Sequence, residues 1–327
     1  MSNTKSTATF GASSTDIKRV IALGFFDGVH IGHSALLRRT TEVAASIGAE
    51  PSVLSFDTHP GTVVSGRPVP LICDAAARVD LIKRLHGITG VIFVHFNEET
   101  MNMPWDVFVA SMKNELGASH LIAGHDFRFG RGGEGNAEKL SAFCAENGMG
   151  CDIVQPVSLD GAVVSSTRIR ALIADGDMPA ANALLGHPHI LLGTVETGYR
   201  LGRTLGTPTI NMRFSENVIV PRFGVYATKV YYEGGERLAV TNIGVRPTVG
   251  AGQAITAESF GSVKDRPAIT VESFLLDFEG DLYGHEVRVE FFEFLRPEIK
   301  FPNLDALKDQ IQRDASSARA YFFPEVV

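Results

Sequence analysis

The sequence predicts an α/β domain with a Rossmann-like parallel sheet, followed by a small antiparallel β-barrel and a C-terminal helix. Strand-like and helix-like segments alternate through the first half of the chain, whereas the second half contains short alternating runs separated by turn residues. A length of 327 residues suffices for two hydrophobic cores. We expect a disordered tail over residues 1–17, the α/β domain over 18–186 and the barrel domain over 187–327.

Five apolar runs of the first half are separated by helical patterns, as in βαβ units with a parallel sheet. The expected strands cover residues 20–23, 52–56, 90–95, 120–123 and 152–156, and the expected helices cover 34–47, 78–85, 104–116, 137–146 and 178–185. Gly48 follows the first helix as a stop signal. Sheets of this kind bind ligands beyond the carboxyl ends of their strands, so functional residues are expected there.

The second half contains six short strand-like runs, which together predict a small antiparallel barrel. They cover residues 191–195, 209–214, 225–232, 238–243, 269–278 and 287–294. Residues 231–236 have the composition of a hairpin turn, and residues 285–291 alternate between apolar and polar. Asn303 is the expected N-cap of the C-terminal helix.

The composition indicates a soluble globular protein, with 44% hydrophobic and 20% charged residues. A net charge of −7 argues against a nucleic-acid-binding surface, and no apolar stretch approaches the roughly 20 residues of a membrane span. The first sixteen residues lack the apolar core of a secretory signal. Cys73, Cys144 and Cys151 are odd in number and widely spaced, which favours a reducing, cytoplasmic location. The sequence does not determine the oligomeric state, and a homo-oligomer is possible.

Residues 24–33, Gly-Phe-Phe-Asp-Gly-Val-His-Ile-Gly-His, form the most informative motif, between the first expected strand and helix. Backbone N–H groups and the helix dipole make such a position an anion site. Gly28 and Gly32 leave room for a polyphosphate, and His30 and His33 share one face of an exposed helix start. The alternatives are an ordinary exposed helix face or half of a metal site. Agreement between strand, loop and helix favours phosphate binding.

A second motif, residues 165–170 with the sequence Ser-Ser-Thr-Arg-Ile-Arg, precedes an expected helix. The hydroxyls of Ser166 and Thr167 and the guanidinium of Arg170 are suited to holding phosphates. Taken alone, the motif is better explained as an ordinary helix cap. Together with the histidine loop, it favours a nucleotide site of two parts.

Residues 130–135 contain Gly-x-Gly-x-x-Gly, the pattern of dinucleotide-binding loops. In such loops the first glycine follows the strand directly. Residues 125–129 intervene here, so we interpret the segment as a mobile glycine-rich loop near the substrate. The chain contains no Gly-x-x-x-x-Gly-Lys-Ser/Thr sequence, which excludes a kinase of the P-loop type.

The second half contains one unusual loop, residues 198–211, in which several glycines and a proline surround Arg203. Thr209 and Asn211 alternate onto one face of the strand that follows, and their neutral oxygens suit Mg²⁺ bound with ATP phosphates. A solvated strand face explains these two residues equally well. Glu272 is a candidate general base, although a single glutamate on a strand is usually just exposed.

Seven motifs, in this order along residues 18–323, resemble the bifunctional riboflavin kinase/FMN adenylyltransferase family, the prokaryotic FAD synthetases. They are GFFDGVHIGH, AGHDFRFG, SSTRIR, GRTLGTPTIN, TNIGVRPT, VESFLLDFEGDLYG and LRPEIKF. The resemblance implies a nucleotidyltransferase domain that adenylylates FMN and a barrel that phosphorylates riboflavin. ATP, riboflavin, FMN and FAD are then the ligands, with Mg²⁺ accompanying ATP.

The resemblance also implies residue roles. His30, His33 and Arg170 would stabilise the departing pyrophosphate, Glu272 would be the kinase base, and Thr209 and Asn211 would bind Mg²⁺. The other implied adenylyltransferase ATP residues are Gly24, Phe25, Asp27, Gly28, Gly32, Ser166 and Thr167. The flavin or substrate-loop candidates are Pro60, Asp126, Phe127, Arg128 and Asn136. The remaining kinase ATP or flavin candidates are Gly198, Gly202, Arg203, Gly206, Pro208, Asn242, Arg296 and Glu298.

Three positions depart from the family pattern: Val163 and His187 stand where basic residues are typical, and Thr207 where an aromatic residue is. Two alternatives follow. One is a nucleotidyltransferase of the same His-x-Gly-His type that acts on a pantetheine or a pyridine mononucleotide. The other is a flavin-binding or regulatory protein that retains only one of the two activities.

Overall fold

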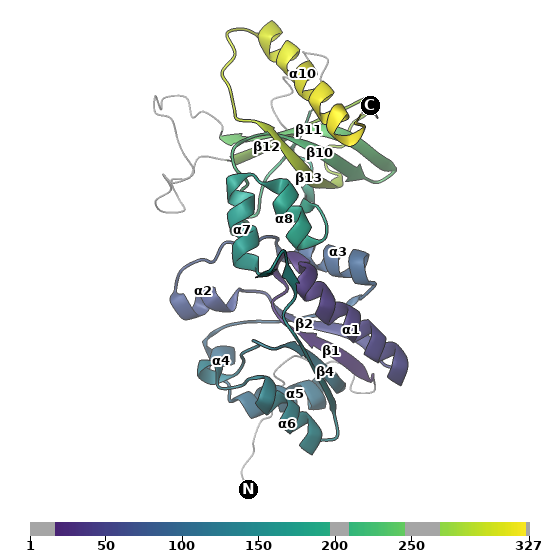
Figure 1. Ribbon diagram of the computed structural model, residues 1–327, viewed down its shortest axis with the longest axis vertical. Coiled ribbons are helices and arrows are strands. Elements are labelled where there is room, and N and C mark those ends of the chain that lie inside the picture. The colour runs from purple at the N-terminus through teal and green to yellow at the C-terminus, as the bar shows by residue number, and fades with distance from the viewer. Residues whose placement is uncertain (1–16, 197–208, 246–268, 325–327) are drawn as a thin grey trace. The chain divides into compact units, whose positions relative to one another are not determined.

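The computed structural model describes residues 17–196, 209–245 and 269–324 (Figure 1). Its contacts divide the chain into two compact units. The first contains residues up to Val69 and Arg78–Ser165, and the second contains Pro70–Ala77 and everything from Ser166 onward. The sequence places the functional boundary at residue 186, which stays a prediction, whereas the contacts group residues 166–186 with the barrel.

The first unit is built on a five-stranded parallel sheet with the order β3-β2-β1-β4-β5. The strands are β1 (Arg19–Leu23), β2 (Glu50–Phe56), β3 (Gly90–Val94), β4 (Ala118–Gly124) and β5 (Gly150–Val154). The main helices between them are α1 (Ile31–Ile47), α3 (Ala75–His86), α5 (Trp105–Leu116) and α6 (Ala137–Glu146). The expected α/β domain with a Rossmann-like sheet is therefore confirmed.

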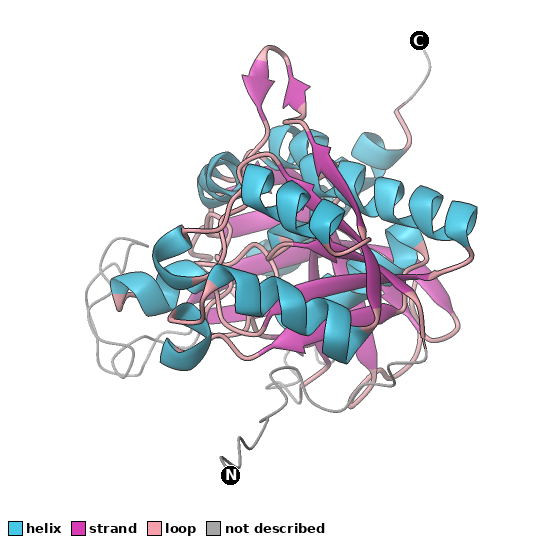
Figure 2. Ribbon diagram, turned by 90° about the horizontal axis from the view of Figure 1, so that it is seen from below, coloured by secondary structure: helices cyan, strands magenta, loops and turns pink. Residues whose placement is uncertain are grey.

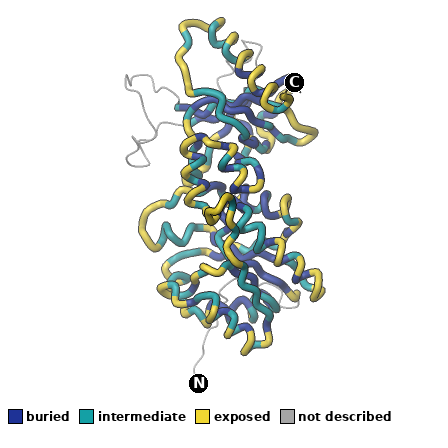
Figure 3. Tube along the Cα trace, viewed as in Figure 1, coloured by how far each residue is buried: buried dark blue, intermediate teal, exposed yellow. Residues whose placement is uncertain are grey.

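Alternating side chains of β1 separate the two faces of this sheet. Val20 packs with residues of α1, whereas Ile21 and Leu23 belong to the larger core with α5 and α6. A hydrogen bond of 3.2 Å between His86 Nε2 and Ser34 Oγ joins α3 to α1. Most residues of the inner strands β1, β2 and β4 are buried, as expected for a sheet covered on both faces, whereas the edge strands β3 and β5 are largely half-buried. Figure 3 colours the chain by burial.

The second unit contains a curled, six-stranded antiparallel sheet with the order β8-β13-β10-β11-β12-β9. The strands are β8 (His189–Thr194), β9 (Thr209–Met212), β10 (Gly224–Tyr232), β11 (Gly235–Val245), β12 (Ile269–Leu275) and β13 (Glu286–Arg296). A bridge between Glu196 and Asn211 connects the chain after β8 to β9, so the two edges of the sheet approach each other. All six expected runs form strands, and Tyr232 pairs with Gly235 at the expected hairpin.

Among the described residues, three helices accompany this sheet: α7 (Ser166–Asp175), α8 (Met178–Leu185) and α10 (Leu304–Phe322). The helix α10 begins as expected, because the Asn303 side chain accepts a hydrogen bond of 2.8 Å from the N–H of Ala306. Ala315 and Ala318 of α10 are buried against β10 and β11. Figure 2 distinguishes these helices from the strands by colour.

A segment from the first half of the sequence also belongs to the second unit. Leu71 forms a parallel bridge with Val218, and the Ser215 hydroxyl donates a hydrogen bond of 2.6 Å to Asp74. The sequence patterns gave no signal for this pairing. They also missed the short helices α2 (Pro60–Ser65) and α4 (Glu98–Met101) and the hairpin β6–β7, which spans residues 158–163.

The interior of the barrel contains a chain of buried hydroxyls. Thr228 and Thr241 lie 2.7 Å apart at their hydroxyl oxygens, and Thr241 and Ser273 lie 2.8 Å apart. All three are fully buried. In the described part of the chain, no helix has the length and apolar character needed to cross a membrane.

The ion pair between Arg296 and Asp314 should stabilise the barrel strongly. Asp314 is 4% exposed and accepts hydrogen bonds of 2.7–3.1 Å from the Arg296 guanidinium, which joins α10 to β13. Removing one charge of such a buried pair costs about 3 kcal/mol. We expect Asp314→Asn to lower the hydrogen-exchange protection of the β10 and β13 amides by about a hundredfold.

The matched control is Asp277→Asn, which changes the exposed pair between Asp277 and Arg319. Exposed pairs contribute at most about 1 kcal/mol, so the protection should change by less than about fivefold. Equal effects of the two substitutions would contradict the assignment of α10 docking to the buried pair.

Candidate active sites

The loop that follows β1 has an unusual backbone. Phe26, Gly28 and Val29 have φ angles of 59°, 72° and 44°, all in the left-handed region. A phenylalanine and a β-branched valine adopt this region only when their surroundings hold them there. Asp27, Gly28 and Val29 form a buried 3₁₀ turn between the strand and α1. The expected phosphate loop is therefore a strained segment with a fixed shape.

His30 is the N-cap of α1. Its Nδ1 atom accepts a hydrogen bond of 3.2 Å from the N–H of His33, and the two imidazoles stack with centroids 3.6 Å apart. A Cβ atom at Gly32 would lie 3.1 Å from the His30 ring, so a larger residue there would push the ring from its position by a few tenths of an ångström. His30 is only 6% exposed, so the expected exposed position is wrong for this residue. Capping explains the burial, because it turns the ring back over the first turn of the helix.

His33 is held in its neutral form. Burial lowers its pKa well below the ordinary value, and the nearby His30 and Arg78 lower it further. Its Nδ1 atom is buried and has no hydrogen-bond partner among the described residues. A neutral imidazole still donates one hydrogen bond, so His33 can act as a donor toward a phosphate at neutral pH.

The end of β2 supports this loop. The Ser55 hydroxyl donates a hydrogen bond of 2.9 Å to the carbonyl oxygen of Phe25, and the Phe25 ring packs on His59 at 4.7 Å. His59 caps α2, where Pro60 occupies the first turn. The Pro60 segment and the histidine motif therefore meet at the carboxyl ends of β1 and β2.

Sequence patterns missed Arg78, the largest of the fully buried side chains described. Its Nη1 atom donates hydrogen bonds of 2.8 Å to Ser55 Oγ and 3.0 Å to the carbonyl oxygen of Phe56. A signal was present, because Arg78 lies three and four positions before the buried Leu81 and Ile82 on one helix stripe.

The loop after β4 lies beside the histidine motif, since Leu23 pairs with Ala123 at the ends of the two parallel strands. The helices that follow β1 and β4 pack on opposite faces of the sheet, and sheets of this kind bind ligands beyond the strand ends at such a point. Asp126 and Arg128 are exposed there, and Phe127 stacks on Phe129 at 5.4 Å.

Two predicted features of this loop have structural roles. The Asn136 side chain caps α6 by accepting a hydrogen bond of 2.9 Å from the N–H of Lys139. The glycine-rich segment is closed by a bridge between Phe129 and Gly135, and a Cβ atom at Gly130 would lie 2.6 Å from Trp105. Gly130 and Gly135 therefore pack closely against protein, whereas a Cβ atom at Gly132 would meet nothing within 4 Å, and the segment does not have the form of a dinucleotide-binding turn.

The second phosphate motif begins α7. Arg170 Nη2 donates a hydrogen bond of 3.2 Å to the Thr167 hydroxyl, one turn earlier on the helix. Ser166 and Arg170 are half-buried and Thr167 is exposed. The hydroxyls and guanidinium of this motif therefore gather at the start of one helix, as expected.

In the barrel, three predicted residues form one row across neighbouring strands. Glu272 of β12 lies directly opposite Asn211 of β9 and Asn242 of β11. Directly opposed side chains share a face of the sheet, so the carboxylate is placed between two amides. The Asn242 amide also donates a hydrogen bond of 3.3 Å to Glu298. Burial raises the pKa of Glu298, and the negative charge of Glu272 contributes in the same direction.

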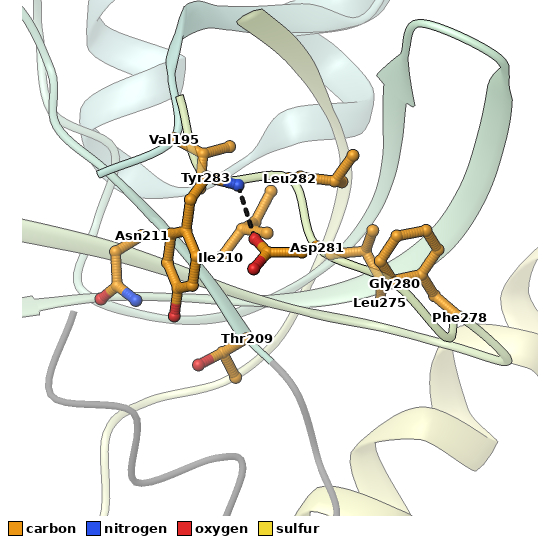
Figure 4. Close-up of a pocket in the computed structure, with 10 residues that line it drawn as sticks. All are labelled: Val195, Thr209, Ile210, Asn211, Leu275, Phe278, Gly280, Asp281, Leu282 and Tyr283. Carbon is orange, nitrogen blue, oxygen red and sulfur yellow. Dashed lines mark hydrogen bonds between the residues drawn. The ribbon is translucent and has the colours of Figure 1, made fainter. Parts of the chain in front are cut away.

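Thr209 and Asn211 also line a pocket with apolar walls (Figure 4). The other residues around it are Val195, Ile210, Leu275, Phe278, Gly280, Asp281, Leu282 and Tyr283. The Asp281 carboxylate accepts a hydrogen bond of 2.9 Å from the N–H of Tyr283, which fixes the turn before β13. Sequence analysis includes this turn in the motif VESFLLDFEGDLYG but assigns its residues no role, because they meet Thr209 and Asn211 only when β9 and β12 pair.

The remaining predicted residues divide into three groups. Gly198, Gly202, Arg203, Gly206, Thr207 and Pro208 lie outside the described residues. Arg296 forms the ion pair with Asp314, so its guanidinium has a structural partner. Among the departures from the family pattern, Val163 is 54% exposed on β7 (Ala162–Val163), and His187 is buried with Nδ1 2.7 Å from the carbonyl oxygen of Pro188.

Comparisons with known proteins match both halves of the chain. Residues 12–168 match the family described as FAD synthetase, and residues 185–322 match the family described as riboflavin kinase. Two relatives, from Listeria monocytogenes and Pseudomonas fluorescens, are named bifunctional riboflavin kinase/FMN adenylyltransferase. The Listeria protein is 34% identical to this chain, and the match covers 94% of each chain. The Pseudomonas protein is 36% identical, and the match covers 93% of each chain.

A solved structure is also similar. A crystal structure described as a macrolide-efflux protein from Streptococcus pneumoniae has a TM-score of 0.77 and 28% identity, and the match covers 93% of this chain and 94% of that chain. Because the two enzyme families match separate halves and the bifunctional relatives cover nearly the whole chain, this protein belongs to the bifunctional riboflavin kinase/FMN adenylyltransferase family, which makes FMN and then FAD from riboflavin and ATP.

Proposed function

We propose that the barrel phosphorylates riboflavin at the row formed by Asn211, Glu272 and Asn242, and that the first unit adenylylates FMN at the loop after β1. The observation that carries this assignment is the separation of the two sites. A carboxylate between two amides lies in the half that matches riboflavin kinase, and a buried histidine cap lies in the half that matches FAD synthetase. A cytoplasmic location suits the three cysteines, which are free thiols.

In the kinase site, Glu272 is the general base. It accepts the proton of the terminal ribityl hydroxyl of riboflavin while the oxygen attacks the γ-phosphorus of ATP, and ADP leaves. The apolar walls formed by Ile210, Leu275 and Phe278 suit the adenine ring. With the adenine ring against these walls, the polar groups of Thr209 and Asn211 in the same pocket would face the phosphates of ATP.

The residues of the pocket also fit a magnesium ion. The Thr209 hydroxyl and the Asn211 carbonyl are neutral oxygen donors two positions apart on one strand, and Mg²⁺ prefers oxygen ligands shared with substrate phosphates. When bound, the ion would neutralise charge that develops on the transferred phosphate.

In the adenylyltransferase site, a phosphate oxygen of FMN attacks the α-phosphorus of ATP and pyrophosphate leaves. No protein nucleophile is required, because the phosphate attacks once it is oriented. His30 and His33 donate hydrogen bonds to the phosphates, and the positive end of α1 adds to the anion site. Ser166, Thr167 and Arg170 remain the second predicted phosphate motif, an assignment supported by the family resemblance and by their cluster at the start of α7.

Replacing the proposed base tests the kinase site. Glu272→Gln keeps the size of the side chain but removes the proton acceptor, so FMN formation should fall about 10²-fold or more. FAD formation from supplied FMN should remain near the wild-type rate. Both rates are measured by chromatography of the flavins.

Glu286→Gln, an exposed change at the start of β13, is the matched control and should leave both rates unchanged. A Glu272→Gln variant with normal FMN formation would exclude Glu272 as the base.

Replacing the histidines tests the adenylyltransferase site. His33→Ala removes one preorganised donor, which typically costs about 10²-fold in rate. His30→Asn retains a cap acceptor for α1 while it removes the ring, so it separates folding from phosphate binding. We expect the rate of FAD formation to fall about a hundredfold in both variants, whereas the rate of riboflavin phosphorylation should stay at the wild-type value. Wild-type FAD formation in both would show that the loop after β1 is not the adenylylation site.

The metal assignment predicts a selective change in magnesium requirement. Asn211→Ala should raise the Mg²⁺ concentration for half-maximal FMN formation by about tenfold or more. The Mg²⁺ requirement of FAD formation should stay constant, because Asn211 belongs only to the barrel. A titration of both reactions with Mg²⁺ measures this, and equal shifts in the two reactions would contradict the proposal.

A further inference from the structure

Arg78 of α3 is a charged side chain on the buried stripe of its helix, where an apolar side chain is expected. It is fully buried, like its stripe neighbours Leu81 and Ile82. Burying a guanidinium costs several kcal/mol unless good hydrogen bonds compensate, and an apolar side chain of similar size is often as stabilising. The core of this unit therefore has no need of an arginine here.

The contacts of Arg78 lead to the phosphate loop. Its Nη1 atom donates a hydrogen bond of 2.8 Å to Ser55 Oγ, and that hydroxyl donates one of 2.9 Å to the carbonyl oxygen of Phe25. The guanidinium carbon also lies 4.0 Å from the centroid of the Phe25 ring. Arg78 therefore holds the backbone and the side chain of the residue that precedes the first left-handed position, Phe26.

We propose that Arg78 is a positioning residue for adenylyl transfer, which holds the strained loop after β1 in the shape that binds the phosphates of ATP. The inference rests on the proposed function of that loop. A planar guanidinium is suited to this task, because it donates in fixed directions and stacks on an aromatic ring at the same time. Phe26 and Val29 have φ values of 59° and 44°, and a strained backbone of this kind tends to relax unless its surroundings hold it. By fixing Ser55 and Phe25, Arg78 opposes that relaxation.

The positive charge has a second effect in the same place. Besides burial, the groups of the described residues that lower the pKa of His33 are His30, on the preceding loop, and Arg78, on α3. Removing the charge of Arg78 should therefore move the pKa of His33 upward. A lysine would retain the charge but could not form the two directed hydrogen bonds together with the ring contact.

The test compares Arg78→Met, Arg78→Lys and Ser55→Ala in the full chain, with Arg84→Met as the matched control on the same helix. Arg84 is exposed and pairs with Asp80 one turn earlier. We expect Arg78→Met and Ser55→Ala to lower kcat/KM for FAD formation about tenfold or more, since small misplacements of a reacting group cost up to about 10²-fold. Arg78→Lys should be intermediate, and FMN formation in the same samples should match that of Arg84→Met.

Titration of the histidine ring signals by NMR provides a readout that a purely structural role would not move. The His33 pKa should rise in Arg78→Met and stay constant in Ser55→Ala, which keeps the charge. Should Arg78→Met fail to fold, as judged by a changed fluorescence of Trp105 in the first unit, Ser55→Ala still tests the relay through its rate. Normal FAD formation in Ser55→Ala, or in a folded Arg78→Met, would overturn the inference. If His33→Ala is also normal, the proposed site itself fails.

Discussion

The parallel pairing of β1 with its two neighbours determines the position of the proposed adenylyltransferase site in the first unit. Because β1 lies between β2 and β4, its carboxyl end is adjacent to the ends of both. The histidine loop after β1 thereby receives support from Ser55 on one side and opens toward the loop after β4 on the other. Glycine at 28 and 32 and the cap formed by His30 then give the segment its shape.

In the barrel, the register of the strands, not a loop at a strand end, positions the proposed site residues. There, antiparallel register aligns Asn211, Glu272 and Asn242 across three strands that are far apart in the sequence. The bridge from Glu196 to Asn211 brings the other edge of the sheet to the same row. The proposed site of the α/β unit thus consists of loops at strand ends, whereas the proposed site of the barrel consists of residues within strands.

Sequence patterns predicted both folds because their signals are local. Alternating runs marked all six barrel strands, and Gly48 and Asn303 end and begin their helices as expected. The patterns gave wrong or no predictions for residues whose burial depends on tertiary contacts. The cap interaction buries His30, and Arg78 occupies an apolar stripe because its partners lie on β2. Likewise, the Asp281–Tyr283 turn lines a pocket together with Thr209 and Asn211 of β9, which are distant in the sequence.

The pairing of Leu71 with Val218 has a consequence for dissecting this enzyme at the level of the gene. A fragment that starts at residue 187 would lack the segment 70–77, so that the backbone partners of Leu71 at Asn217 and Ile219 would lose their hydrogen bonds. It would also lack α7 and α8, including the hydrogen bond of 2.8 Å from Asn182 to the carbonyl oxygen of Phe291 on β13. The compact unit that contains the riboflavin kinase match is encoded by two separate stretches of the gene, so a single linear cut cannot excise that unit whole.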